Sequence, residues 1–285
     1  MDLTKTLDSY ELTCEPMRGE DVPRLHELSI AVNWPHRPHD WELLLSLGHG
    51  FVARDEIGRI LGSAMWFPIG PTIANVGMVI TSPRLQDNGA GRWLMGHVLR
   101  ATVGRTRILN ATKAAYRLYL SLDFTPTGTV YQHQGVLGDL PDGPDDAVPL
   151  EDAHHDALLS MDARAYGGDR HAVLTRLLTL SQGVVLERAG QLAGFALCRP
   201  FGRGHVIGPV VAASEQDCIA LIRPLMAGHA GDFLRMDTRE KDGALRAFLA
   251  AAGLRSYDQV TTMALGAPPV SGPERVFGLV NQALG

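Results

Sequence analysis

The sequence predicts an α/β chain of two similar domains, each a mixed, largely antiparallel sheet flanked by helices. The chain has 285 residues, and a domain takes roughly 150 residues, so two domains are expected. Hydrophobic residues make up 45% and charged residues 20% of the chain, which is typical of globular domains with a sizeable core. The expected strands and helices also follow the same order in the two halves, which indicates an internal repeat.

A segment near the middle of the chain separates the two halves. Residues 138–147 read GDLPDGPDDA, so they are rich in Gly, Pro and Asp and lack apolar periodicity. Such a segment is typical of an exposed linker between domains. We therefore expect one domain over residues 1–137, a linker over 138–147 and a second domain over 148–285.

Apolar spacing predicts the elements of the first half. A strand over 12–17 precedes a helix whose apolar residues Val22, Leu25, Leu28 and Val32 recur every three or four positions. Asp40 can cap a second helix over 41–47. The later elements are a hairpin of strands over 51–53 and 60–67, a strand over 72–81, a helix over 92–103, a strand over 107–111, a helix over 114–122 and a strand over 128–134.

The second half repeats this order with little identity. Ser214 can cap the helix over 215–227, which has an acidic first turn. The other elements are helices within 151–180, strands over 183–187, 191–199 and 205–213, a strand over 233–237, a helix over 243–252, a strand over 260–265 and a helix in the tail 273–284. In each half, adjacent strands joined by short turns imply antiparallel pairs, so the sheet is mixed rather than doubly wound.

Charge and cysteine content exclude several classes of function. The net charge is −5, so no positive field favours a nucleic acid or an anionic membrane. No apolar run approaches the roughly 18–20 residues of a membrane-spanning helix, and no signal peptide is evident. Cys14, Cys198 and Cys218 are far apart and odd in number, as expected of reduced thiols. We expect a cytoplasmic protein without nucleic-acid or membrane partners; the sequence leaves the oligomeric state open.

One turn carries a recognisable chemistry. Gln86-Asp87-Asn88-Gly89-Ala90-Gly91 lies between an expected strand and an expected helix. The two glycines permit positive φ and close approach of a ligand, and the helix start offers unpaired N–H groups. Together these features favour a phosphate or pyrophosphate site, with a plain strand–helix turn as the alternative. A Rossmann turn would need glycine at Leu94, and no Gly-Lys-Ser/Thr of a P-loop follows.

The segment from Ile80 to Leu94, ITSPRLQDNGAGRWL, resembles the acetyl-coenzyme A signature of the GNAT acetyltransferase superfamily. That signature is a strand, a proline and then Gln/Arg-x-x-Gly-x-Gly/Ala opening a helix. Downstream, Tyr119-Leu-Ser-Leu-Asp-Phe124 resembles the family's Tyr-x-x-x-Gly-Phe element, with Asp123 in place of the glycine.

Further segments resemble a subgroup that carries two GNAT domains in one chain. In the first half these are Leu109-Asn-Ala-Thr112, Trp34-Pro35 and Asp40-Trp41; in the second half they are Tyr166-Gly-Gly-Asp-Arg170 and Ile207-Gly-Pro209. The second half departs from the signature over 210–217, which has no glycine and an acidic helix start that would repel a pyrophosphate. The resemblance thus implies a C-terminal domain that keeps the fold and has lost the coenzyme A turn.

The resemblance also implies which residues bind acetyl-CoA as a co-substrate. Backbone groups of the strand would hold the pantetheine arm, and backbone groups of the turn would hold the pyrophosphate. In order along the chain, these residues are Val79, Ile80, Thr81, Gln86, Asp87, Asn88, Gly89, Ala90, Gly91 and Arg92.

Acetyl transfer from a thioester to an amine needs positioning and two proton transfers. An alkyl ammonium of pKa ~10.4 must lose a proton, and the leaving thiolate is helped by an O–H donor. The family position suggests Tyr119 as that donor; a structural tyrosine is the alternative. No acidic residue lies between Thr72 and Thr81, where many relatives place a base.

The segment from Trp34 to Trp41, WPHRPHDW, supplies the remaining candidates. His36 and Asp40 could deprotonate or orient the amine, and Trp34 and Trp41 could wall the acceptor pocket. An ordinary proline-rich loop with a helix cap at Asp40 is the alternative. His36-x-x-His39 lacks further ligands at a helpful spacing, so no bound metal is expected.

We therefore expect an N-acetyltransferase that moves an acetyl group from acetyl-CoA to an amine by direct transfer in a ternary complex. A small-molecule acceptor is expected, and the mild acidity favours a cationic one. A small amine, an amino acid, an aminoglycoside-like drug and a protein N-terminus all stay open as acceptors. The alternative function is a non-catalytic sensor that binds acyl-CoA and passes a signal to a partner.

Overall fold

The computed structural model describes residues 3–7, 10–86 and 88–285. Its first half contains β1 (Thr4–Leu7), β2 (Tyr10–Pro16), α1 (Val22–Ala31), α2 (Pro38–Leu47), β3 (His49–Asp55), β4 (Ile60–Ile69), β5 (Ile73–Thr81), α3 (Ala90–Ala101), β6 (Thr106–Ala111), α4 (Tyr116–Leu120) and β7 (Thr125–Val136). Its second half contains β8 (Val148–Pro149), α5 (His155–Tyr166), α6 (His171–Leu178), β9 (Gln182–Arg188), β10 (Gln191–Phe201), β11 (Gly204–Ala212), α7 (Glu215–Ala227), β12 (Phe233–Thr238), α8 (Ala244–Ala251), β13 (Arg255–Leu265) and β14 (Arg275–Gly278).

All of these strands belong to one 14-stranded sheet that runs through both halves. The order is β1-β2-β3-β4-β5-β6-β13-β7-β12-β11-β10-β9-β8, with β14 paired to β11. Two pairs are parallel, β5 with β6 in the first half and β11 with β12 in the second, and the other described pairs are antiparallel. The predicted mixed, largely antiparallel sheet in each half is thus confirmed.

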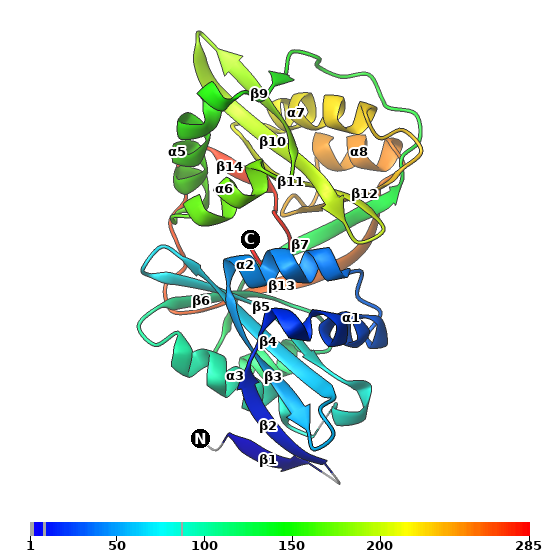
Figure 1. The fold of residues 1–285 in the computed structure, drawn as a ribbon. Helices are drawn as coiled ribbons and strands as arrows, with labels where there is room; N and C mark the ends of the chain where they lie inside the picture. Colours follow the sequence, from blue (N-terminus) through cyan, green and yellow to red (C-terminus); the bar gives the residue numbers. More distant parts are fainter. Residues whose placement is uncertain (1–2, 8–9, 87) are drawn as a thin grey trace.

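The last long strand of each half completes the sheet of the other half. β7 pairs with β12 from Tyr131–Thr238 to Val136–Phe233, and β13 pairs with β6 from Thr261–Ala111 to Leu265–Arg107. β7 and β13 also pair with each other, and both cross the middle of the molecule (Figure 1). The predicted order of elements gave no sign of this exchange, because strand partners are not encoded in local patterns. The predicted bounds of the two domains, with a linker over residues 138–147, stay a prediction.

Helices cover both faces of the sheet, and the two halves share one core. Buried side chains of α1, α2, α5 and α6 form a single cluster with one face of the strands. The opposite face is covered by α3 and α4 in the first half and by α7 and α8 in the second. Figure 1 shows α2 lying close to the second half, in agreement with the shared core. Cys14, Cys198 and Cys218 are buried and form no disulfide with one another.

The predicted helix in the tail 273–284 is wrong. Residues 275–278 form β14, and 279–284 continue without a helix along the first half. Every residue from Val276 to Asn281 is buried, so the segment has no polar face. A helix at a surface needs one polar face, whereas an extended segment between two layers does not. Among the described residues, no helix is long and apolar enough to cross a membrane.

A buried polar network fixes this tail to both halves. Arg170 donates to both carboxylate oxygens of Asp162, at 3.0 Å and 2.6 Å, and also to the main-chain oxygen of Gly285. Its guanidinium lies 4.2 Å from the centre of the Tyr166 ring. Tyr166 donates to Asn75 Oδ1 at 2.8 Å, and Asn75 donates to the main-chain oxygen of Leu284 at 2.9 Å. These contacts connect α5 and the tail to β5 of the first half.

We expect Asp162→Ala to lower the free energy of unfolding by about 3–5 kcal/mol, because it leaves the Arg170 charge buried and unpaired. Both side chains are 1% exposed. Urea denaturation followed by circular dichroism measures the change. Glu27→Ala is the matched control: it removes an exposed ion pair with Arg24, 3.4 Å long, and should cost less than about 1 kcal/mol. Equal losses in the two variants would contradict the structural role of the Asp162–Arg170 pair.

Candidate functional site

The site lies where two neighbouring strands diverge. β5 and β6 pair from Ile73–Thr106 to Val76–Leu109, although β5 continues to Thr81. The register between β4 and β5 shifts after Met65–Gly77, and Met78 adopts a positive φ of 52°. This bulge bends β5 away from β6 and turns its later residues towards the space between the strands. Ser63 on β4 supports the bulge by donating to the main-chain oxygen of Met78 at 2.8 Å.

A pocket of about 300 Å³ opens at this divergence and draws its lining from both halves. From the first half it takes Val32, Asn33, Trp34, Pro35, His36, Val76, Gly77, Met78, Val79, Asn110, Thr112, Ala115, Tyr119 and Gln132. From the second half it takes Phe201, Arg235, Tyr257, Asp258, Val260, Asn281, Gln282 and Ala283. A further pocket of about 390 Å³, around Tyr166 and Arg239, contains none of the site residues predicted from the sequence.

Gly77 allows the tail to close one side of the 300 Å³ pocket. A Cβ atom added at Gly77 would lie 2.5 Å from the Cβ of Ala283, so only glycine fits against the tail at this place. Asn110 on β6 donates to the main-chain oxygen of Gln282 at 2.8 Å and so holds the residue that precedes Ala283 in the tail. The tail of the second half is therefore part of the wall.

Tyr119 presents its phenol to the pocket from α4. The side chain is buried, and its ring meets that of Phe124 edge-on with 5.9 Å between centroids. Burial raises the pKa of the Tyr119 phenol, so the group stays protonated and can donate a hydrogen bond. Asp123, which replaces the glycine expected from the family resemblance, adopts φ 64°, and Phe124 N donates to the main-chain oxygen of Tyr119 at 3.1 Å. Aspartate tolerates this conformation, so the turn after α4 forms without glycine.

The turn before α3 leaves the start of this helix open to an anion. Gly89 is the N-cap residue, with φ 81°, and no side chain of the described residues caps the helix. Gly91 packs against α4, since a Cβ there would lie 3.2 Å from Leu118 Cδ2. The first turn carries no acidic residue, and Lys5 Nζ lies 3.3 Å from the Gly89 oxygen. Free N–H groups, the helix dipole and a nearby cation together suit a phosphate.

The other residues of this turn support the same arrangement. Arg92 donates to the main-chain oxygen of Ser121 at 3.2 Å and so joins α3 to the end of α4. Gln86 donates to the Thr81 oxygen at 3.4 Å, which links the turn back to the end of β5. Val79, Ile80 and Thr81 form that end of β5. Asn88 and Ala90 lie within the turn and at the helix start, and Asp87 lies outside the described residues.

The corresponding helix of the second half is already capped. Ser214 Oγ accepts from Asp217 N at 3.2 Å, which confirms the predicted cap. Glu215 and Asp217 place two negative charges in the first turn of α7, and Glu215 accepts from Leu245 N at 2.7 Å. This helix start therefore has neither the free donors nor the field that a phosphate needs.

His36 lies in the pocket as a neutral imidazole. Its ring is 5.7 Å from that of Trp34 and 5.4 Å from that of Phe201, and its Nδ1 is buried without a hydrogen-bond partner among the described residues. Burial, together with the charges of Arg235 and Arg199, lowers the pKa of His36 to about 3. A group this weakly basic is a poor acceptor for the proton of an alkyl ammonium. It can still accept or donate a hydrogen bond.

Asp40 and Trp41 do not line the pocket. Asp40 is not the N-cap expected from the sequence, because α2 begins at Pro38 and its N-cap is Arg37. From the third position of the helix, Asp40 Oδ2 accepts from Arg37 N at 2.8 Å and from Gly202 N of the second half at 3.1 Å. Its other oxygen is 3.9 Å from Arg199 Nη1. Trp41 is fully buried in the core and donates to Ser29 Oγ at 3.0 Å. The structure thus groups Trp34, His36 and Tyr119 around one pocket and uses Asp40 and Trp41 to hold the wall in place.

No pocket residue of the second half was predicted from the sequence. Arg235 donates to Asp237 at 3.0 Å and 2.6 Å, and both side chains are buried. Arg235 and Asp237 carry opposite charges at alternate positions of a mostly apolar strand, and this pattern could have indicated a buried ion pair. Asp258, Asn281 and Gln282 carry no local pattern that would have indicated the site.

Comparisons with known proteins agree with this geometry. Two sequence models described as "Acetyltransferase (GNAT) domain" match residues 46–126 and 158–278. An "Uncharacterized N-acetyltransferase YitH" from Bacillus subtilis (strain 168) is 28% identical over 280 residues, which cover 94% of this chain and 97% of the relative.

Solved structures share the fold. A putative acetyltransferase from Pyrococcus horikoshii superposes with a TM-score of 0.81 at 18% identity and covers 96% of each chain. A tandem GNAT protein from the clavulanic acid biosynthesis pathway has a TM-score of 0.65 at 16% identity, over 91% of this chain and 100% of that one. The fold is therefore that of the acetyltransferases with GNAT domains. The chain belongs to the GNAT acetyltransferase family, in the group with two GNAT domains in tandem.

We expect the free energy of unfolding to fall as the pH is lowered from about 6.5 towards 3, in part because of His36. Its pKa is 6.5 in a free side chain and about 3 in the folded chain, so the unfolded state binds a proton first. Nitrogen-detected NMR of the histidine side chains should show His36 neutral at pH 5, with His36→Gln used for assignment. His36→Gln should also remove part of the pH dependence. A His36 midpoint near 6.5 would contradict its burial in the pocket.

Proposed function

We propose that this chain transfers an acetyl group from acetyl-CoA to the amine of a small-molecule acceptor within one ternary complex. The observation that carries the proposal is the position of the divergence between β5 and β6. It lies between the open start of α3, which suits a pyrophosphate, and the pocket that holds the Tyr119 phenol. A molecule that spans these two places has an anionic end and a reactive end, as an acyl-CoA does.

The chain's own residues would hold acetyl-CoA along this path. The N–H groups of Ala90, Gly91 and Arg92 are directed out of the helix start and would bind the pyrophosphate. The edge of β5 after the bulge, from Val79 to Thr81, would pair with the amides of the pantetheine arm. The acetyl thioester would then lie in the pocket beside Tyr119.

The reaction makes one C–N bond and breaks one C–S bond. The neutral amine attacks the thioester carbonyl, and the Tyr119 hydroxyl gives its proton to the departing thiolate. The proton released from the amine nitrogen passes to solvent through the open side of the pocket, and the phenolate regains a proton from solvent. His36 orients the amine by a hydrogen bond rather than taking its proton, because its pKa is about 3.

The charges in the pocket favour a cationic acceptor. Arg235 is neutralised by Asp237, and Arg199 faces Asp40, so these four charges balance. Asp258 on β13 is an exposed carboxylate in the lining, and Asn110, Gln132 and Gln282 add uncharged polar groups. A volume of about 300 Å³ suits a small molecule. We infer an acceptor that carries a second positive charge near Asp258.

Release of free thiol from acetyl-CoA tests the proposal with a panel of monoamines, diamines, polyamines and amino acids. Thiol release that depends on an amine, with diamines above monoamines of similar length, supports an acetyltransferase with this pocket. Coenzyme A binding without release for any amine would favour the acyl-CoA sensor. No binding of coenzyme A at all would exclude both functions.

Gly89→Glu and Gly91→Glu should each abolish coenzyme A binding while the fold survives. A side chain at Gly89 strains the backbone at φ 81°, and one at Gly91 makes a tight contact with Leu118; each also adds a negative charge beside the proposed pyrophosphate site. Calorimetric titration with coenzyme A measures the loss. Gly104→Glu is the matched control, since Gly104 has φ 82° and open space but follows the other end of α3. Unchanged affinity in the Gly89 and Gly91 variants would refute this site.

Tyr119→Phe should lower kcat by about 10²–10⁴-fold and leave KM for acetyl-CoA nearly unchanged, because the phenol acts mainly in the transition state. Steady-state kinetics with the best amine of the panel measures both constants. Tyr116→Phe is the control, since Tyr116 is on the same helix but outside the pocket lining. A Tyr119→Phe enzyme with near-normal kcat would remove the phenol from the mechanism.

A further inference from the structure

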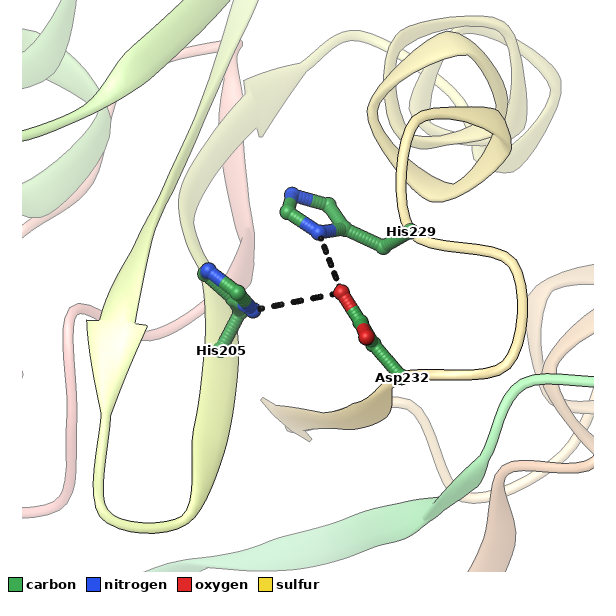
Figure 2. Close-up of side chains that lie close together, drawn as sticks. All are labelled: His205, His229 and Asp232. Carbon is green, nitrogen blue, oxygen red and sulfur yellow. Dashed lines mark hydrogen bonds and ion pairs between the residues drawn. The ribbon is translucent and has the colours of Figure 1, made fainter.

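Three side chains of metal-binding types converge in the second half, outside the pocket described above. His205 lies near the start of β11, and His229 and Asp232 lie in the turn between α7 and β12. Both imidazole rings face one carboxylate oxygen of Asp232 (Figure 2). That oxygen, Oδ2, is 3.0 Å from His229 Nδ1 and 3.9 Å from His205 Nδ1. One ligand atom of each residue lies within 4.8 Å of those of the other two.

We propose that His205, His229 and Asp232 bind one divalent transition-metal ion, Zn²⁺ by preference. Two imidazole nitrogens and one carboxylate oxygen suit zinc, whereas Mg²⁺ and Ca²⁺ prefer oxygen ligands throughout. Ligand atoms about 2.0–2.1 Å from a tetrahedral zinc ion are about 3.3 Å apart. The two distances to the carboxylate are 3.0 Å and 3.9 Å, and the two histidine nitrogens lie within 4.8 Å of each other, so the side chains would move closer together to bind an ion, and water would complete the coordination.

The state of His205 supports a ligand role. Its Nδ1 is buried and has no hydrogen-bond partner among the described residues, although an unpaired buried polar atom is unfavourable. The two imidazole rings lie 4.1 Å apart, so one ion could contact both.

An ion here would join three parts of the fold. His205 is paired with Pro200 across the β10–β11 hairpin and with Leu234 on β12. The main-chain oxygen of Asp232, not its carboxylate, accepts from Leu137 N at 2.9 Å, and Leu137 directly follows the exchanged strand β7. The same hairpin carries Phe201, which lines the 300 Å³ pocket. The ion would therefore fix the pocket wall to the point where β7 enters the second half.

Calorimetric titration of the full chain with ZnCl₂, after removal of any histidine tag, tests the site. We expect one Zn²⁺ per chain, no binding of Mg²⁺, and a rise of roughly 5 °C in Tm at saturating zinc. His229→Ala and Asp232→Asn should each weaken zinc binding by at least about tenfold. His171→Ala is the matched control, because His171 also pairs with an aspartate, Asp169, at 2.7 Å but belongs to no such cluster among the described residues.

Absence of zinc binding, or zinc binding that His229→Ala and Asp232→Asn both retain, would overturn the proposal. Equal binding of Mg²⁺ would overturn it too. Circular dichroism without zinc checks the fold of each variant. If a variant does not fold, anomalous diffraction at the zinc edge from crystals of the unmodified chain decides. A peak between the three side chains supports the site, and a peak elsewhere or none overturns it.

Discussion

The pairing of β7 with β13 is the constraint on which the rest of the structure depends. Because each strand also completes the sheet of the other half, neither half can close its sheet alone. The exchange brings Gln132 of β7 and Asp258 of β13 to the place where β5 and β6 diverge. It also brings the tail 279–284 against Gly77. The pocket is therefore a product of the junction between the two halves rather than of the first half alone.

The two halves share a fold but differ in the property that matters for binding. At the start of α3, the N-cap residue is a glycine without a capping side chain, and the first turn of the helix carries no acidic residue. At the start of α7, by contrast, Ser214 caps the helix and two acidic residues stand in its first turn. The second half instead supplies charged and polar side chains to the shared pocket. Its buried charges are paired, as burial requires, which leaves the exposed Asp258 to set the charge at the pocket.

Local signals were sufficient for most of the helices and strands and for the glycine turn at the start of α3. The glycine turn, the helix that follows it and the cap at Ser214 each depend on residues that are neighbours in sequence. The strand exchange, Arg235 and the cluster of His205 with His229 depend on contacts between residues far apart in the chain. The error at 273–284 has the same origin: burial on all sides by distant elements replaced the polar face that a helix there would need. The roles of His36 and Asp40 likewise turned on charges and partners from the second half.

A crystal structure of the full chain with acetyl-CoA tests the central claim most directly, namely that one cofactor site in the first half opens into a pocket completed by the second. The account predicts one molecule per chain, with its pyrophosphate at the N–H groups of 90–92 and its acetyl group between Tyr119 and the side chains of Arg235 and Asp258. A second molecule at the start of α7, or an acetyl group outside the pocket between the halves, would contradict the account.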